Sequence, residues 1–169
     1  MSTSLIWFFG FGMAPLALAQ GQQGGEDVTG SNVVYEVTPS GGQILPNQIP
    51  GMTEIIGLGG ARFGFRVAPR VFVETGLLAG NGEGVLYRNL FSSVRVDIPI
   101  ETLVGVVFGG VDAINYEGVD KDLKTFGAAH VGGGVQALLG GNVWFRSNMK
   151  FNVNPGTAMI IDFGLSFRF

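Results

Sequence analysis

The sequence predicts an all-β protein, namely an eight-stranded antiparallel up-and-down transmembrane β-barrel. Apolar and polar residues alternate along most of the chain, as side chains do on the two faces of a β-strand. Eight such segments follow one another, separated by turn signals. The composition is also unusual, with 14% charged and 46% hydrophobic residues and 29 glycines in 169 residues, whereas soluble domains have about 25% charged residues. This combination favours a barrel that faces lipid.

The last segment, residues 157–169, has the most regular alternation. One face carries the apolar residues Met159, Ile161, Phe163, Leu165, Phe167 and Phe169. The other face carries Ile160, Asp162, Gly164, Ser166 and Arg168. Residues 142–153 repeat the pattern, and Asn154-Pro155-Gly156 predicts a turn between the two strands.

The same alternation, less regular, predicts the other strands. The expected bounds are about 33–41, 54–67, 70–79, 84–98, 102–114, 122–139, 142–153 and 157–169. A membrane-spanning strand needs about 9–11 residues, so each segment is long enough. Tight turns at 68–69, 99–101 and 140–141 alternate with mostly longer connections, as in transmembrane barrels. The faces of the glycine-rich stretches 103–113 and 124–139 remain ambiguous.

The charged face is expected to line the lumen. Its predicted charge network comprises Glu36, Arg62, Arg66, Glu74, Arg95, Arg146, Asp162 and Arg168. A barrel of eight strands is just wide enough for its own side chains, so we expect a filled polar lumen. Glu74 should pair there with one or more of Arg62, Arg95 and Arg146. The opposite face is almost free of charge, and its aromatic residues near strand ends are expected to form girdles at the membrane interfaces.

The N-terminal residues predict export. Residues 5–19 form an apolar run that ends in Ala17-Leu18-Ala19, so residues 1–19 are expected to be a signal peptide cleaved before Gln20. The absence of Lys and Arg from residues 1–4 departs from the usual pattern. The Gly- and Gln-rich residues 20–32 predict a flexible periplasmic N-terminus. Residues 33–169 then form the barrel, placed in a bacterial outer membrane after export through the periplasm.

Residues 33–169 resemble the OmpA/OmpX-like, opacity-type family of outer-membrane β-barrels. The resemblance rests on Tyr35-Glu36-Val37-Thr38-Pro39, on residues 60–67 and 131–135, on Phe72-Val73-Glu74 and Phe145-Arg146, and on the terminal Gly164-Leu165-Ser166-Phe167-Arg168-Phe169. The terminal group looks like the C-terminal signal that the barrel-assembly machinery reads. The resemblance implies that Gly164, Leu165, Phe167 and Phe169 carry this recognition. It also implies that outer-membrane lipids and the assembly machinery are partners.

The sequence predicts no catalytic, cofactor-binding or metal-binding residues. His130 is the single histidine, and Val131-Gly132 after it lacks the His-x-Ser spacing of barrel deacylases that act on lipid A. No Ser, Asp or Glu can be assigned to His130 from the sequence.

Residues 132–137 match the dinucleotide-binding pattern G-x-G-x-x-A, but the helix that such a site needs is not expected after them. The acidic residues 115–122 do not have the spacing of an EF-hand loop. There is no cysteine, and a net charge of −3 without a basic patch argues against nucleic acid as a partner.

We therefore expect a non-enzymatic outer-membrane barrel with a structural or surface-interaction role and no cofactor. Its outer connections, residues 42–53 and the loop around Tyr116, are the expected contact surface for an unidentified surface or envelope protein. Two alternatives stay open. One is a narrow pore, and the other is a barrel enzyme that modifies lipid A.

Overall fold

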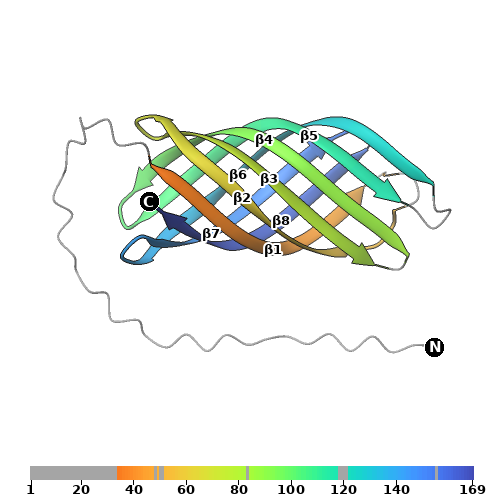
Figure 1. The fold of residues 1–169 in the computed structure, drawn as a ribbon, viewed down its shortest axis with the longest axis horizontal. Coiled ribbons are helices and arrows are strands. Elements are labelled where there is room, and N and C mark those ends of the chain that lie inside the picture. Colours follow the sequence, from red (N-terminus) through yellow and green to blue (C-terminus); the bar gives the residue numbers. More distant parts are fainter. Residues whose placement is uncertain (1–33, 48, 50–51, 83, 118–121, 155) are drawn as a thin grey trace. The chain divides into compact units, whose positions relative to one another are not determined.

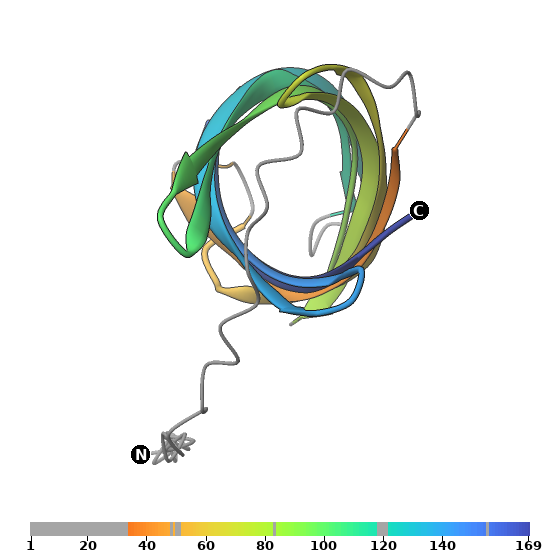
Figure 2. The same ribbon diagram turned by 90° about the vertical axis from the view of Figure 1, so that its left-hand side faces the viewer.

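The computed structural model describes residues 34–47, 49, 52–82, 84–117, 122–154 and 156–169, and these form a closed antiparallel β-barrel (Figure 1). The strands are β1 (Tyr35–Asn47), β2 (Ile56–Ala68), β3 (Val71–Gly82), β4 (Val85–Ile100), β5 (Leu103–Glu117), β6 (Leu123–Gly140), β7 (Val143–Val153) and β8 (Thr157–Arg168). Each strand pairs with its neighbours in sequence, and Figure 2 shows the strands as a ring. The predicted fold class is confirmed. The predicted signal peptide and the predicted flexible segment 20–32 lie outside the described residues.

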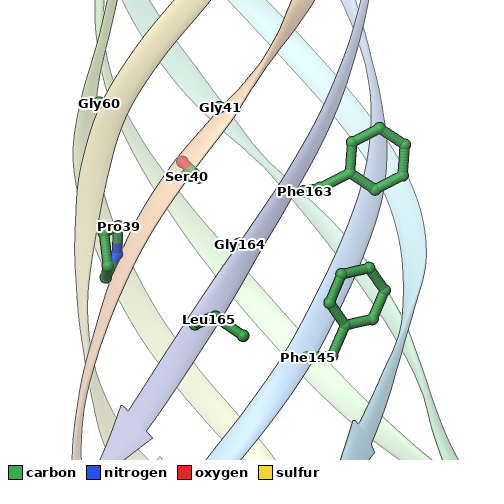
Figure 3. Close-up of a pocket in the computed structure, with 8 residues that line it drawn as sticks. All are labelled: Pro39, Ser40, Gly41, Gly60, Phe145, Phe163, Gly164 and Leu165. Carbon is green, nitrogen blue, oxygen red and sulfur yellow. The ribbon is translucent and has the colours of Figure 1, made fainter. Parts of the chain in front are cut away.

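The barrel closes where β1 pairs with β8. Glu36 lies opposite Arg168 at one end of this seam, and Asn47 lies opposite Thr157 at the other. Next to Glu36, the backbone of Tyr35 exchanges two hydrogen bonds with that of Phe169, at 3.2 and 2.9 Å. Figure 3 shows the two strands side by side at the middle of the seam. Closure leaves no unpaired edge among the described strands, which removes the usual template for strand-to-strand aggregation.

The two ends of the barrel differ. At the end that carries Tyr35 and Arg168, called here the terminal end, two-residue turns join β2 to β3, β4 to β5 and β6 to β7. Positive φ angles at Arg70 (66°), Glu101 (47°) and Gly141 (53°) tighten these turns. The opposite end, called here the loop end, carries the other four connections. In the described part of the chain, no helix has the length and hydropathy needed to cross a membrane.

Two predicted loops are partly strand. β1 continues to Asn47, so residues 42–47 belong to the barrel wall and not to an outer loop. The glycine at position 42 is needed there, because a Cβ would lie 2.0 Å from the carbonyl oxygen of Ile161. β5 likewise continues to Glu117, so Tyr116 is a buried strand residue and not part of a contact loop. Both predictions were wrong because the apolar and polar alternation marks the interior of these strands but not the residues at which they end.

Charged side chains line part of the lumen, and the outer wall is mainly apolar. On β4, for example, Arg95 and Asp97 are buried inside, while Val94 and Val96 between them are exposed outside. This arrangement is the reverse of a soluble barrel and is typical of transmembrane barrels.

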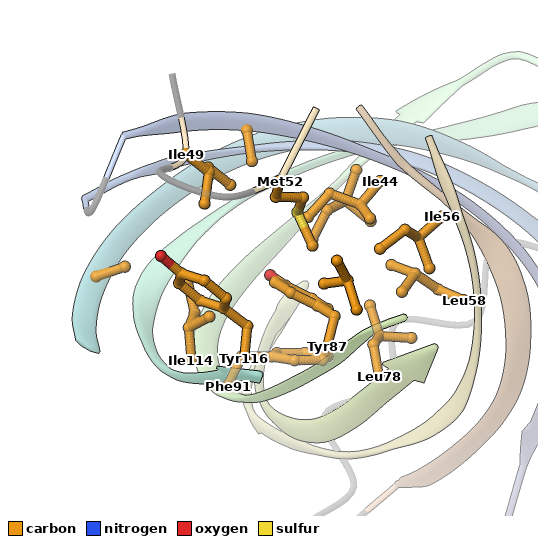
Figure 4. Packing of buried hydrophobic residues seen from close by; sticks show 14 residues of the cluster. Ile44, Ile49, Met52, Ile56, Leu58, Leu78, Tyr87, Phe91, Ile114 and Tyr116 are labelled. Atoms are coloured by element: carbon orange, nitrogen blue, oxygen red, sulfur yellow. The ribbon is translucent and has the colours of Figure 1, made fainter. Parts of the chain in front are cut away.

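The lumen is not polar along its whole length. Buried apolar side chains fill its loop end (Figure 4). This apolar cluster comprises Ile44, Ile49, Met52, Ile56, Leu58, Leu78, Val85, Tyr87, Phe91, Ile114, Tyr116, Ala128, Ala158 and Ile160. The expected polar lumen is therefore restricted to the remaining part, towards the terminal end. Strand alternation alone could not show this, because it assigns a residue to a face but not to a depth.

Candidate functional site

Four buried charges from four strands meet in the lumen near the terminal end. Glu36 of β1 and Glu74 of β3 lie on either side of Gly64 in the ladder, which has no side chain to separate them. Arg95 donates to Glu36 at 2.7 Å and also contacts Glu74 directly. Arg146 lies 2.5 Å from Glu74 and 3.3 Å from Glu36. Both carboxylates thus contact both of these guanidinium groups, which offsets the repulsion between two adjacent anions.

Further ion pairs extend this group in both directions. Arg168 donates to Glu36 at 2.9 Å at the terminal end, and to Gln136 at 2.6 Å. Towards the loop end, Arg62 donates to Asp162 at 2.6 Å. Most of the predicted network residues are thereby brought together. Arg66 is half-buried on β2, four residues from Arg62.

Among the residues that the structure describes, the buried ion pairs join cationic side chains to carboxylates. Five cationic side chains meet five carboxylates there, namely Arg62, Arg95, Arg146, Lys150 and Arg168 with Glu36, Glu74, Asp97, Asp112 and Asp162. Buried charges are tolerated when each has such a partner.

A second polar group lies between the charge network and the apolar cluster. The Nε2 atom of His130 on β6 lies 2.8 Å from the Oγ atom of Ser93 on β4, and its Nδ1 atom lies 2.5 Å from the Oδ2 atom of Asp112 on β5. Lys150 on β7 donates to the other oxygen of Asp112 at 2.7 Å. No partner for His130 could be assigned from the sequence, because the glycine-rich β5 and β6 have ambiguous faces. The register explains the contact, since Gly110 lies between Ser93 and His130 and leaves room for both side chains.

The order Ser93, His130, Asp112 is that of a nucleophilic triad, but two requirements of acyl transfer are missing. All three residues are at most 5% exposed, and the rings of Phe91 and Phe108 lie against His130 at centroid distances of 6.3 and 6.1 Å. The backbone around Ser93 is paired with strands on both sides, whereas an oxyanion hole needs unpaired N–H donors. In the described residues the group is a set of buried, mutually hydrogen-bonded polar side chains from β4, β5, β6 and β7.

The outer wall carries a groove at the β1–β8 seam (Figure 3). Its volume is about 470 Å³, and it is lined by Pro39, Ser40, Gly41, Gly60, Phe145, Phe163, Gly164 and Leu165. Two residues of the predicted assembly signal, Gly164 and Leu165, belong to this lining. The other two, Phe167 and Phe169, are exposed on the outer wall closer to the terminal end. No group of three or more His, Cys, Asp or Glu side chains in the described residues is arranged to hold a metal ion.

No protein-family model matches the sequence, and no curated protein sequence matches it.

Several solved structures share the fold. The N-terminal β-barrel domain of OprF from Pseudomonas aeruginosa superposes with a TM-score of 0.66 at 15% identity, over 80% of this chain and 97% of that domain. Neisserial surface protein A gives a TM-score of 0.66 at 9% identity, over 81% of this chain and 97% of that protein chain. Ail, the attachment invasion locus protein of Yersinia pestis, gives a TM-score of 0.53 at 8% identity, over 81% of this chain and 98% of that protein chain. At these identities the similarity is one of fold, and the fold is that of outer-membrane β-barrels.

Proposed function

We propose that the protein is a closed, non-conducting and non-enzymatic barrel of a bacterial outer membrane, with a structural or surface-interaction role. One observation supports the proposal: among the described residues, buried side chains from the strands meet inside the barrel towards both of its ends. Ion pairs such as Arg95–Glu36 and Arg146–Glu74 lie towards the terminal end, and the apolar cluster lies at the loop end. An eight-stranded barrel is about as wide as this packing requires.

Residues of the connection between β1 and β2 add to the apolar cluster at the loop end. Ile49 and Met52 belong to the connection between β1 and β2, and both are buried in the apolar cluster. The backbone N–H of Met52 donates to the carbonyl oxygen of Ile49 at 3.1 Å. An apolar plug of this kind opposes the entry of water and ions.

The location is supported by the apolar outer wall and by the outer-membrane proteins that share the fold. In this arrangement the terminal end faces the periplasm and the loop end faces outwards. The exposed residues 53–55, before β2, and residues 122–123, at the start of β6, then form part of the contact surface. The proposed partners are outer-membrane lipids, the barrel-assembly machinery during insertion, and an unidentified surface or envelope protein.

Conductance in planar bilayers tests the closed lumen. The refolded protein is expected to produce no discrete current steps under conditions in which a reference porin does. Reproducible steps from the wild-type chain would favour the narrow-pore alternative.

The lipid A of producing cells, analysed by mass spectrometry, tests the absence of enzymatic activity. We expect the same lipid A profile with the wild-type chain, with His130→Ala and with no protein. A modification that appears with the wild type and is lost in His130→Ala would establish the enzyme alternative and contradict the proposal.

A further inference from the structure

The outer wall of β3 to β6 differs from that of the other four strands. Among the described residues, the exposed aromatic side chains all lie on β7, β8, β1 or β2 or directly after β8, namely Tyr35, Phe63, Phe65, Phe145, Phe151, Phe163, Phe167 and Phe169. The expected aromatic girdles therefore do not run around the whole barrel. The large exposed apolar residues of β3 to β6 are only Leu, Val and Ile, and their wall also carries an exposed arginine, Arg88 of β4.

Arg88 lies at the loop-end edge of the apolar wall of β4. Towards the terminal end, the outward-facing residues of β4 run from Leu90 to Ile100 and are apolar except for Ser92. Ten residue steps rise about 33 Å along a strand and about 23 Å across a membrane at a tilt of about 45°. This height is close to the apolar band of about 25 Å in transmembrane barrels. Arg88 is two residues beyond this band, at the level where lipid headgroups begin.

Arg88 is also unusual in its charge environment. Of the basic residues in the described strands, Arg88 alone is exposed, and the others are buried or half-buried. Among the described residues, no ion pair joins Arg88 to a carboxylate. The outward carboxylate of β5, Glu117, lies opposite Leu86 and thus one outward position further towards the loop end. A cation at the level of the headgroups without a protein partner is complementary in charge to a lipid phosphate.

Two polar side chains extend the hydrogen-bond donors of Arg88 across three strands. Arg88 of β4 lies opposite Asn115 of β5, which lies opposite Thr125 of β6, so the three side chains are neighbours on the outer wall. The hydroxyl of Thr125 donates to Oδ1 of Asn115 at 2.7 Å. This bond uses the amide oxygen and leaves the amide N–H groups of Asn115 for another acceptor. A guanidinium group binds phosphate oxygens in a bidentate manner, and an adjacent amide donor adds to such a site.

The wall next to these donors is apolar. Leu90 of β4 is 55% exposed and lies between Leu77 of β3, which is 49% exposed, and Ala113 of β5, which is also exposed. These three residues occupy the next outward positions towards the terminal end. A lipid with its phosphate on Arg88 would therefore lay its acyl chains along them, whereas a free phosphate would use the donors and leave the apolar residues uncovered.

We propose that Arg88, Asn115 and Thr125 form a phosphate site for an anionic lipid of the leaflet that the loop end faces. Arg88 supplies the charge and the bidentate contact, Asn115 supplies a second donor, and Thr125 holds the Asn115 amide in place. The site gives the lipid partner proposed above a specific headgroup and a specific position on the barrel. It rests on the membrane location proposed above, and the test separates the two.

The test is competition between two lipids. The full chain is refolded in detergent and mixed with equal amounts of phosphatidylglycerol and phosphatidylcholine that carry the same acyl chains. Native mass spectrometry measures how much of each lipid the protein retains. Arg88→Gln removes the proposed contact. Arg70→Gln is the matched control, because Arg70 is an exposed arginine at the terminal-end turn between β2 and β3 and its substitution changes the net charge equally.

We expect the wild type and Arg70→Gln to retain phosphatidylglycerol in preference to phosphatidylcholine. Arg88→Gln should lower this preference by about tenfold or more, equivalent to about 1.4 kcal/mol, and Asn115→Leu should lower it by a smaller factor. Equal losses in Arg88→Gln and Arg70→Gln would overturn the proposal, because net charge alone would then explain them. Displacement of the lipid by inorganic phosphate at the same concentration would also overturn it, since the site would then take a free anion.

The folded state is followed in parallel by heat-sensitive migration on a denaturing gel. A wild type that is folded by this criterion and retains both lipids equally would overturn the phosphate site but leave the membrane barrel standing. A wild type that retains neither lipid and shows no heat-sensitive form would contradict the membrane location itself.

Discussion

Leu77 and Leu78 are neighbours on β3, yet Leu78 is 1% exposed inside the lumen and Leu77 is 49% exposed on the outer wall. The pair shows how strand alternation separates two apolar environments in this protein. Leu78 packs in the apolar cluster at the loop end, whereas Leu77 lies on the apolar outer wall.

Leu78→Ala should therefore destabilise the barrel much more than Leu77→Ala. Removing a buried leucine side chain costs about 2–5 kcal/mol, because a cavity remains. The exposed leucine leaves no enclosed cavity, and lipid can fill the space. Urea unfolding of the two variants in the same detergent measures the difference, and equal losses would show that the lumen is not packed at this depth.

Val111→Arg tests whether the outer wall faces lipid. Val111 is 63% exposed near the middle of β5, while Leu123 is 66% exposed at the loop-end start of β6. A lipid-facing arginine costs about 2–4 kcal/mol at the midplane and about 0–1 kcal/mol near an interface. Unfolding in phospholipid vesicles should thus show a large loss for Val111→Arg and a small one for Leu123→Arg. Similar small losses in the free energy of unfolding for both variants would indicate that the outer wall faces water.

Glu74→Gln should destabilise the barrel without opening it. The substitution removes one of two carboxylates shared by Arg95 and Arg146, and loss of a partner from a buried ion pair costs about 3–5 kcal/mol. We expect the lower end of this range, about 3 kcal/mol, because Glu36 still contacts both arginines. Glu101→Gln at an exposed turn is the control and should have little effect. An unchanged melting temperature for Glu74→Gln would exclude the ion pairs as a source of stability.

Ser93→Ala tests the polar group around His130. Loss of its contact to His130 should reduce the free energy of unfolding by about 1 kcal/mol, the usual contribution of one hydrogen bond. His130→Ala should cost more, because it also leaves a cavity between Phe91 and Phe108 and removes one partner of Asp112. Ser92→Ala, on the exposed side of the same strand, should be neutral. Equal changes in the free energy of unfolding for Ser92→Ala and Ser93→Ala would contradict the hydrogen bond between Ser93 and His130.

The closing strand shows how much the sequence alone can predict. Its strict alternation predicted residues 157–169 as a strand, and β8 spans Thr157–Arg168. The prediction was reliable because few glycines interrupt the pattern and apolar residues occupy one face throughout. β1 was harder, because Gly41-Gly42 and Pro46 are ordinary turn signals, and only the close approach of β8 explains a glycine at position 42 within a strand.

The contacts inside the lumen could be predicted only in part. Alternation places Glu74 and Arg95 on the inner face, but their depth depends on the register of each strand pair. Partners across the lumen, such as Glu74 and Arg146, also depend on how the barrel closes. The contact between Ser93 and His130 required the register of β4, β5 and β6 together, with Gly110 between them.

Phe169→Ala tests the predicted assembly signal. The backbone of Phe169 pairs with that of Tyr35, but its side chain is 72% exposed. Its truncation should change the free energy of unfolding by less than about 0.5 kcal/mol, as at most exposed positions. In cells, the amount of folded protein in the outer membrane should fall, while refolding of the purified variant stays normal. Unchanged insertion in cells would rule out recognition of this side chain.

Electrophoretic mobility distinguishes a folded transmembrane barrel from an unfolded chain. Protein refolded in detergent or vesicles is run on a denaturing gel with and without boiling. We expect a distinct band for the unheated barrel that moves to the position of the unfolded chain after boiling. A single band at the unfolded position under both conditions would show that the chain does not fold as a transmembrane barrel.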